Sequence, residues 1–259
     1  NIIESRKVVE HDYSKAYERY LEAANQGCAD AQSNLGFLYQ VGYGVTKDEA
    51  KAVEWYQKAT EQGHTYAHCN LGFMYDRGFG IDQDYVKAVE LYRVSADAGC
   101  ARAQTNLGYL YGDGSGITQD HSKALEMYQK AADQGYPKGQ YNLGVMYEVG
   151  NGVTQDYPKA VEWYQKAANQ GDAEAQCNLG VMYINGRGVV QDFSKALEWF
   201  HKAADRGNEV ALFNLGMVYE HDNGIQDYSK ALEWYRKSAN KGHIDAQFNA
   251  AIMYRDGRG

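Results

Sequence analysis

A repeat of 36 residues is the feature that most restricts how this chain folds. The tripeptide Asn-Leu-Gly begins six times at intervals of 36 residues, and a degenerate copy, Asn249-Ala250-Ala251, follows 35 residues after the last. The six copies begin at Asn34, Asn70, Asn106, Asn142, Asn178 and Asn214. Glycines from Gly27 to Gly242 repeat in the same register, and the residue missing from the last interval lies in the Asp222-Asn223-Gly224-Ile225 loop. Such a period is typical of arrays of small units that stack on one another.

Each unit predicts two helices. In the unit that begins at Asp172, Ala175, Leu179 and Tyr183 recur every four residues and indicate an apolar helical face. We call this first helix A; a Gly-x-Gly turn ends it, and a second helix, B, carries apolar residues around Trp199. An N-cap Asp is expected before every helix B, and a left-handed glycine after it. These aspartates are Asp12, Asp48, Asp84, Asp120, Asp156, Asp192 and Asp227.

The chain is therefore expected to be all-α, a single array over residues 1–259. We divide it into partial repeats 1–27 and 243–259 and full repeats 28–63, 64–99, 100–135, 136–171, 172–207 and 208–242. A Gly follows the Leu of helix A, and Ala recurs in helix B, which indicates that the helices approach closely. A side chain larger than Ala at these places is expected to cost about 1–3 kcal/mol.

The unit pattern is long enough to resemble a known family. It reads A-x-A-Q-x-N-L-G-x-M-Y-x-x-G-x-G-V-x-Q-D-Y-x-K-A-x-E-W-Y-x-K-A-A-x-x-G, which is similar to the Sel1-like repeats, a branch of the tetratricopeptide-like arrays. The resemblance implies a right-handed α/α superhelical solenoid of about seven repeats with helix A on its inner, concave face. It also implies adaptor or scaffold work in signalling, protein quality control or bacteria–host contact. Some bacterial relatives are disulfide-rich and connected with β-lactams, but this chain lacks their paired cysteines.

One side of helix A is the candidate ligand face. The core positions cluster on one side, so the Asn of Asn-Leu-Gly and the apolar residue three positions later should line a groove for an extended peptide. The candidate residues are Asn34, Phe37, Asn70, Phe73, Asn106, Tyr109, Asn142, Val145, Asn178, Val181, Asn214 and Met217, flanked by Tyr66, Tyr141 and Phe213. The position four before Asn varies in charge, as in Asp30 and Arg102. Alternatively, the Asn side chains bond to a neighbouring helix and the apolar residues pack between repeats.

Residues with other chemistry do not form a recognisable active site. Cys28 and Cys100 share one repeat position and Cys69 and Cys177 another, and helices in different repeats are too far apart for either pair to form a disulfide. His64 and His68, four residues apart and followed by Cys69, are a weak metal pattern. The four Trp occupy a helix B position that we interpret as core. Ser238 begins a Ser-x-x-Lys that is best explained as drift from the Ala of other repeats. We expect no catalytic residue, no metal and no cofactor.

Net charge and hydropathy limit the classes of partner that we expect the chain to bind. The net charge is −8, which disfavours nucleic acid and anionic membrane surfaces, and no run is long enough to insert into a membrane. We expect a protein or peptide partner, and the ends, which carry no evident capping helix, could associate end to end. A glycan- or cell-wall-binding module with Tyr66, Tyr109 and Tyr141 as its platform is one alternative, and a β-lactam hydrolase is another. Reduced thiols favour a cytoplasmic setting, and a secreted or luminal form stays open.

Overall fold

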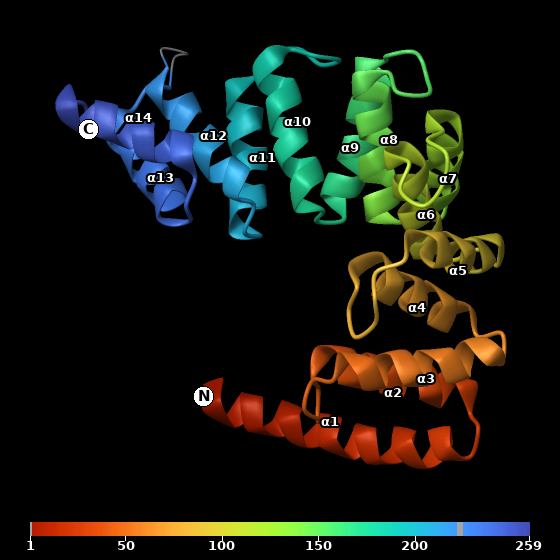
Figure 1. The fold of residues 1–259 in the computed structure, drawn as a ribbon. Helices are drawn as coiled ribbons and strands as arrows, with labels where there is room; N and C mark the ends of the chain where they lie inside the picture. Colours follow the sequence, from red (N-terminus) through yellow and green to blue (C-terminus); the bar gives the residue numbers. More distant parts are fainter. Residues whose placement is uncertain (1, 222–224) are drawn as a thin grey trace. The chain divides into compact units, whose positions relative to one another are not determined.

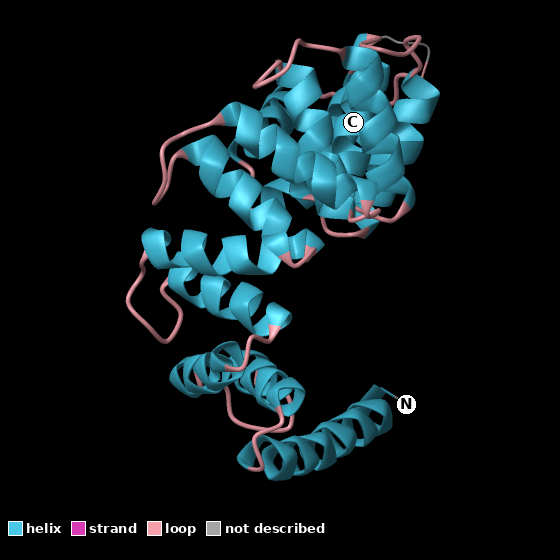
Figure 2. Cartoon of the chain, turned by 90° about the vertical axis from the view of Figure 1, so that its right-hand side faces the viewer, coloured by secondary structure: helices cyan, strands magenta, loops and turns pink. Residues whose placement is uncertain are grey.

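A computed structural model of the chain describes residues 2–221 and 225–259, with side chains described from residue 12 onward. Within these ranges the secondary structure is helical and contains no strand (Figure 2). The all-α repeat fold expected from the sequence is therefore confirmed. The one-residue deletion assigned to residues 222–225 falls largely on residues 222–224, which lie outside the described residues.

The helices belong to two compact units, residues 1–131 and 132–259, which are described separately (Figure 1). The first unit holds α1 (Ile2–Asn25), α2 (Ala29–Val41), α3 (Glu49–Glu61), α4 (Thr65–Arg77), α5 (Tyr85–Asp97), α6 (Ala101–Asp113) and most of α7 (His121–Asp133). The second holds α8 (Pro137–Val149), α9 (Tyr157–Asn169), α10 (Ala173–Asn185), α11 (Phe193–Asp205), α12 (Glu209–Glu220), α13 (Tyr228–Asn240) and α14 (Ile244–Arg255). Even-numbered helices are helix A of their repeat, and odd-numbered helices are helix B.

Aspartate caps start helix B in six of the seven predicted cases. Asp156, for example, accepts a hydrogen bond from the backbone N–H of Lys159 at 3.0 Å, and Asp48, Asp84, Asp120, Asp192 and Asp227 do the same three residues ahead. Asp12 was wrongly predicted as a cap, since it lies inside α1, which begins at Ile2. The preceding residues contain no Gly or Pro, so nothing in the sequence stops the helix from extending in front of Asp12.

Helices A and B of one repeat meet where the Gly of Asn-Leu-Gly faces an aromatic ring. A Cβ on Gly144 would lie 2.7 Å from two ring atoms of the fully buried Tyr164 in α9. The same pairing joins Gly36 with Tyr56, Gly72 with Tyr92, Gly108 with Tyr128, Gly180 with Phe200, and Gly216 with Tyr235. The Gly therefore leaves the space that the ring occupies, as the small-residue pattern predicted.

The Gly-x-Gly turn joins one repeat to the repeat before it. The second glycine packs on the start of the preceding helix B: a Cβ on Gly188 would lie 2.5 Å from backbone atoms of Tyr157. Gly188 also has a φ of +71°, a conformation that a residue with a side chain rarely adopts. The turn is thus a packing element between repeats.

A glutamine in helix A ties it to the end of the preceding helix B, a role that we did not predict. The Nε2 of Gln176 donates to the backbone oxygen of Ala168 at 3.0 Å, and Gln32 donates in the same way to Ala24 at 3.2 Å. These carbonyls lie in the last turn of helix B, where no intrahelical partner remains. The glutamine amide is therefore a second donor to these carbonyls, which also accept from the backbone N–H of Gly171 and of Gly27 at 3.0 Å.

The tryptophans of helix B are only partly buried, which differs from the core position that we expected. Trp163 is half-buried, and the Nζ of Lys166 lies 3.7 Å from its ring centroid. Trp55, Trp199 and Trp234 are covered by Lys58, Lys202 and Lys237 in the same way. A cation over the ring stabilises an aromatic surface that remains open to water on one side.

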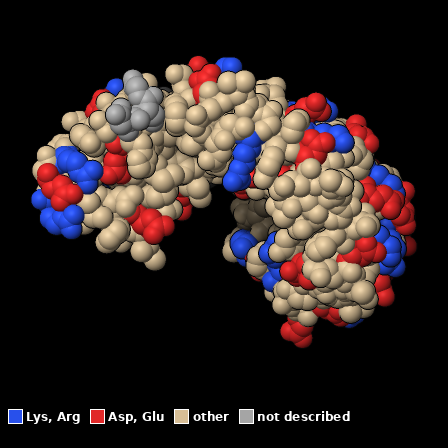
Figure 3. All heavy atoms as spheres, turned by 90° about the horizontal axis from the view of Figure 1, so that it is seen from above, with Lys and Arg blue, Asp and Glu red and all other residues tan. Residues whose placement is uncertain are grey.

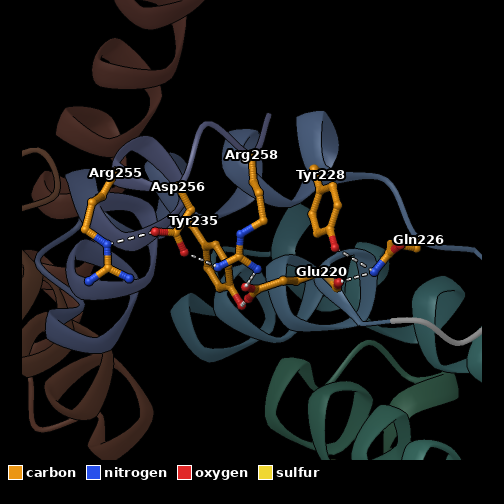
Figure 4. Close-up of polar contacts among 7 residues, drawn as sticks. All are labelled: Glu220, Gln226, Tyr228, Tyr235, Arg255, Asp256 and Arg258. Atoms are coloured by element: carbon orange, nitrogen blue, oxygen red, sulfur yellow. Dashed lines mark hydrogen bonds and ion pairs between the residues drawn. The ribbon is translucent and has the colours of Figure 1, made fainter.

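The segment after α14 folds back onto α12 and α13 (Figure 4). The Arg258 guanidinium lies 3.3 Å from Oε1 of Glu220, whose other oxygen accepts a 2.8 Å hydrogen bond from the Tyr235 hydroxyl. Asp256 pairs with both Arg255 and Arg258. These contacts place the last residues where a Gly-x-Gly turn lies in the other repeats.

Candidate functional site

A hollow in the first unit gathers side chains from the predicted ligand face. It has a volume of about 620 Å³ and is lined by Asp30, Ser33, Asn34, Phe37, His64, Tyr66, Asn70 and Arg102. Seven of these residues lie on helices α2, α4 and α6, and His64 is the N-cap of α4. The repeat therefore brings together equivalent positions of three successive A helices, which are far apart in the sequence.

Two aromatic side chains give the hollow an apolar surface. The Phe37 residue is 45% exposed and Tyr66 is 64% exposed. Burial of large side chains such as these is energetically favourable. The ring of Phe37 is held edge-on against Tyr43 at a centroid distance of 6.4 Å. A ligand that covers these rings would remove apolar area from water without first displacing a protein side chain.

Hydrogen-bonding groups of both kinds surround this apolar surface. The Nδ1 of His64 accepts from the backbone N–H of Ala67 at 3.0 Å, so its Nε2 carries the proton and donates to Oδ1 of Asp30 at 2.9 Å. Arg102 donates to Oδ1 of Asn70 on the neighbouring helix. Asp30, Asn34 and Arg102 therefore offer acceptors and donors to a ligand, as an extended peptide backbone requires.

Many asparagines of the repeat have a structural partner, as the alternative interpretation held. Asn178 donates to the Tyr164 hydroxyl at 3.2 Å, and this hydroxyl donates to Oε2 of Glu148 at 2.6 Å. The chain of bonds joins helices α8, α9 and α10. Asn106 with Tyr92, and Asn249 with Tyr235, repeat the contact.

The exception at Asn214 supports this explanation. Helix B of the preceding repeat has Phe200 in place of Tyr. Ile184 stands where four other repeats have an acceptor and one has Gly112; the acceptors are Gln40, Asp76, Glu148 and Glu220. Asn214 is buried and its Nδ2 lies 3.6 Å from Sγ of Cys177 instead. In this repeat the hydroxyl is lost at Phe200 and its acceptor is lost at Ile184. Asn34 and Asn70, in contrast, lie on the wall of the hollow.

The other candidate residues are distributed along the two units. Tyr109 is 56% exposed, and Phe73, Val145, Val181 and Met217 are half-buried, as is Asn142. In the second unit Tyr141 packs against Tyr164 at 5.9 Å, and Phe213 stacks on His243 at 4.6 Å. Met217 lines a separate apolar hollow of about 230 Å³ with Ile184, Phe193, Val218 and His221. The structure therefore groups only Asn34, Phe37, Tyr66 and Asn70 of the candidate set in the larger hollow.

The candidate list omitted three charged or titratable residues of the hollow. Asp30 and Arg102 occupy the position whose charge varies between repeats, and this variation was the available signal. His64 was considered only as a metal ligand, whereas the structure uses it as an N-cap and as a partner of Asp30. Within the part of the chain that the structure describes, no group of three or more metal-ligating side chains occurs.

Ser238 is not placed for nucleophilic chemistry. It lies in α13 and is completely buried, so a substrate could not reach its hydroxyl in this conformation. The described helices also include none that is both long and apolar enough to span a bilayer. On the face shown in Figure 3, acidic and basic side chains are interspersed over a mainly uncharged surface.

The repeats match a known family along nearly the whole chain. The model of the Sel1 repeat matches residues 6–28, 29–64, 65–100, 101–136, 137–172, 173–208, 210–243 and 244–259. The chain belongs to the Sel1 repeat family. Sel1 repeats are generally protein-interaction modules, and proteins of this family are typically non-catalytic scaffolds.

Several solved structures are similar to this chain. A Sel1 repeat protein from Oxalobacter formigenes is 34% identical with a TM-score of 0.79, over 91% of this chain and 94% of that one. A protective antigen of uropathogenic Escherichia coli strains is 36% identical with a TM-score of 0.76, over 94% of this chain but only 53% of the antigen. The immunity protein Pa5087 from Pseudomonas aeruginosa is 25% identical with a TM-score of 0.54, over 84% of this chain and 82% of that one. The comparison with curated proteins gives no match.

Proposed function

We propose that this Sel1 repeat chain is a non-catalytic adaptor that binds an extended protein segment in the hollow formed by α2, α4 and α6. The observation that carries the proposal is the convergence of exposed Phe37 and Tyr66 with polar groups from three successive A helices. Apolar rings supply binding energy, and the surrounding donors and acceptors suit a backbone that runs across the repeats. The family supports protein binding in general, and the choice of this hollow rests on its geometry.

The chemistry of the hollow indicates which segment would fit. Asp30 and Arg102 place one negative and one positive group beside the rings. A segment with an apolar or aromatic side chain between polar residues, and without a strong excess of either charge, would match this arrangement. A segment of high net positive or negative charge would leave one of the two wall charges without a favourable partner.

The proposal can be tested with peptides that are selected from a random display library for binding to the folded protein. We expect selected peptides to bind with an affinity that falls roughly 10- to 30-fold in a Phe37→Ala/Tyr66→Ala variant, because aromatic anchors dominate such interfaces. Val86→Ala is the matched control, since Val86 is an apolar side chain, 56% exposed, on helix B of the same unit. Fluorescence anisotropy measures the affinity of a selected peptide for the wild-type protein and for each variant.

Equal affinities for the wild-type protein and the Phe37→Ala/Tyr66→Ala variant would rule out the hollow as the binding site. The glycan-binding alternative makes a different prediction. A glycan array would show saccharide binding that falls on removal of the exposed rings Tyr66 and Tyr109.

A further inference from the structure

A further hollow of the second unit, which we call the α11 hollow, lies among the ends of α9 and α11 and the first turn of α10. It has a volume of about 490 Å³, and Gln176, Trp199, Lys202 and Arg206 are among the residues that line it. None of its lining residues belongs to the hollow formed by α2, α4 and α6. Any ligand of the α11 hollow is therefore recognised by a separate set of side chains.

Gln176 brings a buried acceptor without a partner to the α11 hollow. Its side chain is 3% exposed, and its Nε2 is engaged by the backbone oxygen of Ala168 at 3.0 Å. Within the described residues, Oε1 of Gln176 is one of two buried side-chain polar atoms that have no hydrogen-bond partner. A buried acceptor without a donor costs free energy, so a ligand N–H that reaches this oxygen would recover that cost.

The repeat sequence explains why this oxygen lacks a donor. In other repeats the equivalent oxygen accepts from a glutamine that follows helix B. The Nε2 of Gln170 donates to Oε1 of Gln140 at 2.8 Å, and Gln62 donates to Gln32 in the same way at 2.7 Å. Arg206 stands at this donor position in the repeat that begins at residue 172. The exchange of Gln for Arg thus removes a structural donor and adds a cation.

Two cations of the α11 hollow have no carboxylate partner. The Arg206 guanidinium lies over Gly171, where an added Cβ would be 2.6 Å from Cζ. The Nζ of Lys202 lies 4.0 Å from the ring centroid of Trp199. Neither cation forms an ion pair with a carboxylate in the part of the chain that the structure describes. Because Asp205 is the one acidic residue among those that line the hollow, positive charge prevails there.

We propose that the α11 hollow binds a peptide carboxylate of a partner protein, held by Arg206 and Lys202, with the neighbouring peptide N–H donating to Gln176. A guanidinium presents paired N–H donors that match the two oxygens of a carboxylate. A carboxylate of a peptide, at an acidic side chain or at the chain end, has a backbone N–H a few bonds away, which is the donor that Oε1 lacks. The apolar part of the same residue can pack on Trp199.

This second site does not depend on the proposed function, because the two hollows share no residue. Sel1 repeats are generally protein-interaction modules, which supports a peptide as the carrier of the carboxylate. The Phe37→Ala/Tyr66→Ala variant should therefore bind a carboxylate peptide as the wild-type chain does, even if it loses the segment proposed for the first hollow.

Nuclear magnetic resonance titrations of the full chain with three short peptides test the site. Acetyl-Ala-Glu-Ala-amide carries a side-chain carboxylate, acetyl-Ala-Gln-Ala carries a terminal carboxylate, and acetyl-Ala-Gln-Ala-amide carries none. We expect one or both carboxylate peptides to shift the indole N–H signal of Trp199 and the side-chain amide signals of Gln176, and the neutral peptide to shift neither. The tighter of the two carboxylate peptides identifies the source of the carboxylate.

The Arg206→Gln variant should lose this binding without loss of stability. It restores the residue of other repeats, so its amide can donate to Gln176 as Gln170 donates to Gln140. We expect the Kd of the carboxylate peptide to rise about tenfold or more, because charge-assisted hydrogen bonds are lost. The thermal unfolding midpoint should be no lower than that of the wild-type chain.

Lys202→Gln should also weaken binding, and Lys166→Gln is its matched control. Lys166 covers the ring of Trp163 at 3.7 Å in the preceding repeat, where Gln170 stands in place of Arg. An unchanged Kd in Arg206→Gln would overturn the proposal, as would an equal loss of affinity in Lys166→Gln. Equal shifts with the neutral peptide, or no shift with either carboxylate peptide, would also overturn it.

Discussion

Replacing Gly108 by Ala gives a stringent test of how the helices of one repeat pack. A Cβ at Gly108 would lie 2.8 and 3.0 Å from two ring atoms of Tyr128 and 3.3 Å from the backbone oxygen of Ala124. The nearest of these distances is well inside the 3.4–4 Å range of ordinary contact. Tyr128 is only 7% exposed, so its ring has little room to move away.

The magnitude follows from two opposing effects. Overpacking of a tight core costs about 1–3 kcal/mol, and the clash here involves a ring on one side and a backbone atom on the other. Ala stabilises a helix interior by up to about 1 kcal/mol relative to Gly. We therefore expect Gly108→Ala to lower the free energy of unfolding by roughly 1–2 kcal/mol.

Gly112 in the same helix α6 provides a matched control. A Cβ there would meet only the Cβ of Ala124, at an ordinary 3.8 Å, and the equivalent position in other repeats holds side chains as large as Glu148. Gly112→Ala should therefore stabilise the protein by up to about 1 kcal/mol through helix propensity alone. Gly108→Ala is thus predicted to destabilise the protein and Gly112→Ala to stabilise it, although both changes lie in the same helix.

The stability of both variants can be measured by urea unfolding, followed through the helical circular dichroism signal. The urea concentrations at the midpoints are compared, because long repeat arrays depart from two-state unfolding. In the Gly108→Ala background, replacing the ring by a smaller side chain with Tyr128→Leu should recover part of the lost stability. A double-mutant cycle measures this coupling between the two positions. The reasoning fails if Gly108→Ala is as stable as Gly112→Ala.

Three further predictions concern hydrogen bonds that the repeat uses. Tyr164→Phe removes the hydroxyl that donates to Glu148 at 2.6 Å and should destabilise the protein by about 1 kcal/mol. Phe200→Tyr should also destabilise it, because Ile184 offers no acceptor, and adding Ile184→Glu should restore part of the stability in the same urea assay. The backbone N–H of Lys159 lowers the pKa of the Asp156 cap in the folded state, so its contribution to stability is present above the unfolded-state pKa of about 4 and is lost as the pH falls through the lower folded value. Unfolding measured between about pH 3 and pH 6 should show a smaller acid loss for Asp156→Asn, and an unchanged pH profile would contradict the role of this cap.

The helix boundaries were predictable because they depend on local groups. An Asp such as Asp156 satisfies N–H groups three residues ahead, and a glycine such as Gly171 takes a φ of +88° just after the helix, whatever the rest of the chain does. Asp12 shows the limit of this reasoning. The residue type was right, but the preceding segment had no breaker, so α1 continued through it.

The candidate site was only partly predictable. Helical periodicity put Asn34, Phe37, Tyr66 and Asn70 on one candidate face, and these four residues line one hollow in the structure. It did not distinguish these asparagines from Asn178, whose amide is bound to Tyr164, because the partner belongs to another helix.

The sequence alone determined the period of the array, the order of its helices and their ends, because these depend on residues within a few positions of one another. Tertiary structure decided which repeated side chains meet a partner and which remain on the surface. That outcome depends on the side chain of the adjacent repeat, as Phe200 opposite Asn214 shows. Identical residues in a repeat therefore have different roles, since each is packed against a neighbour that is not identical.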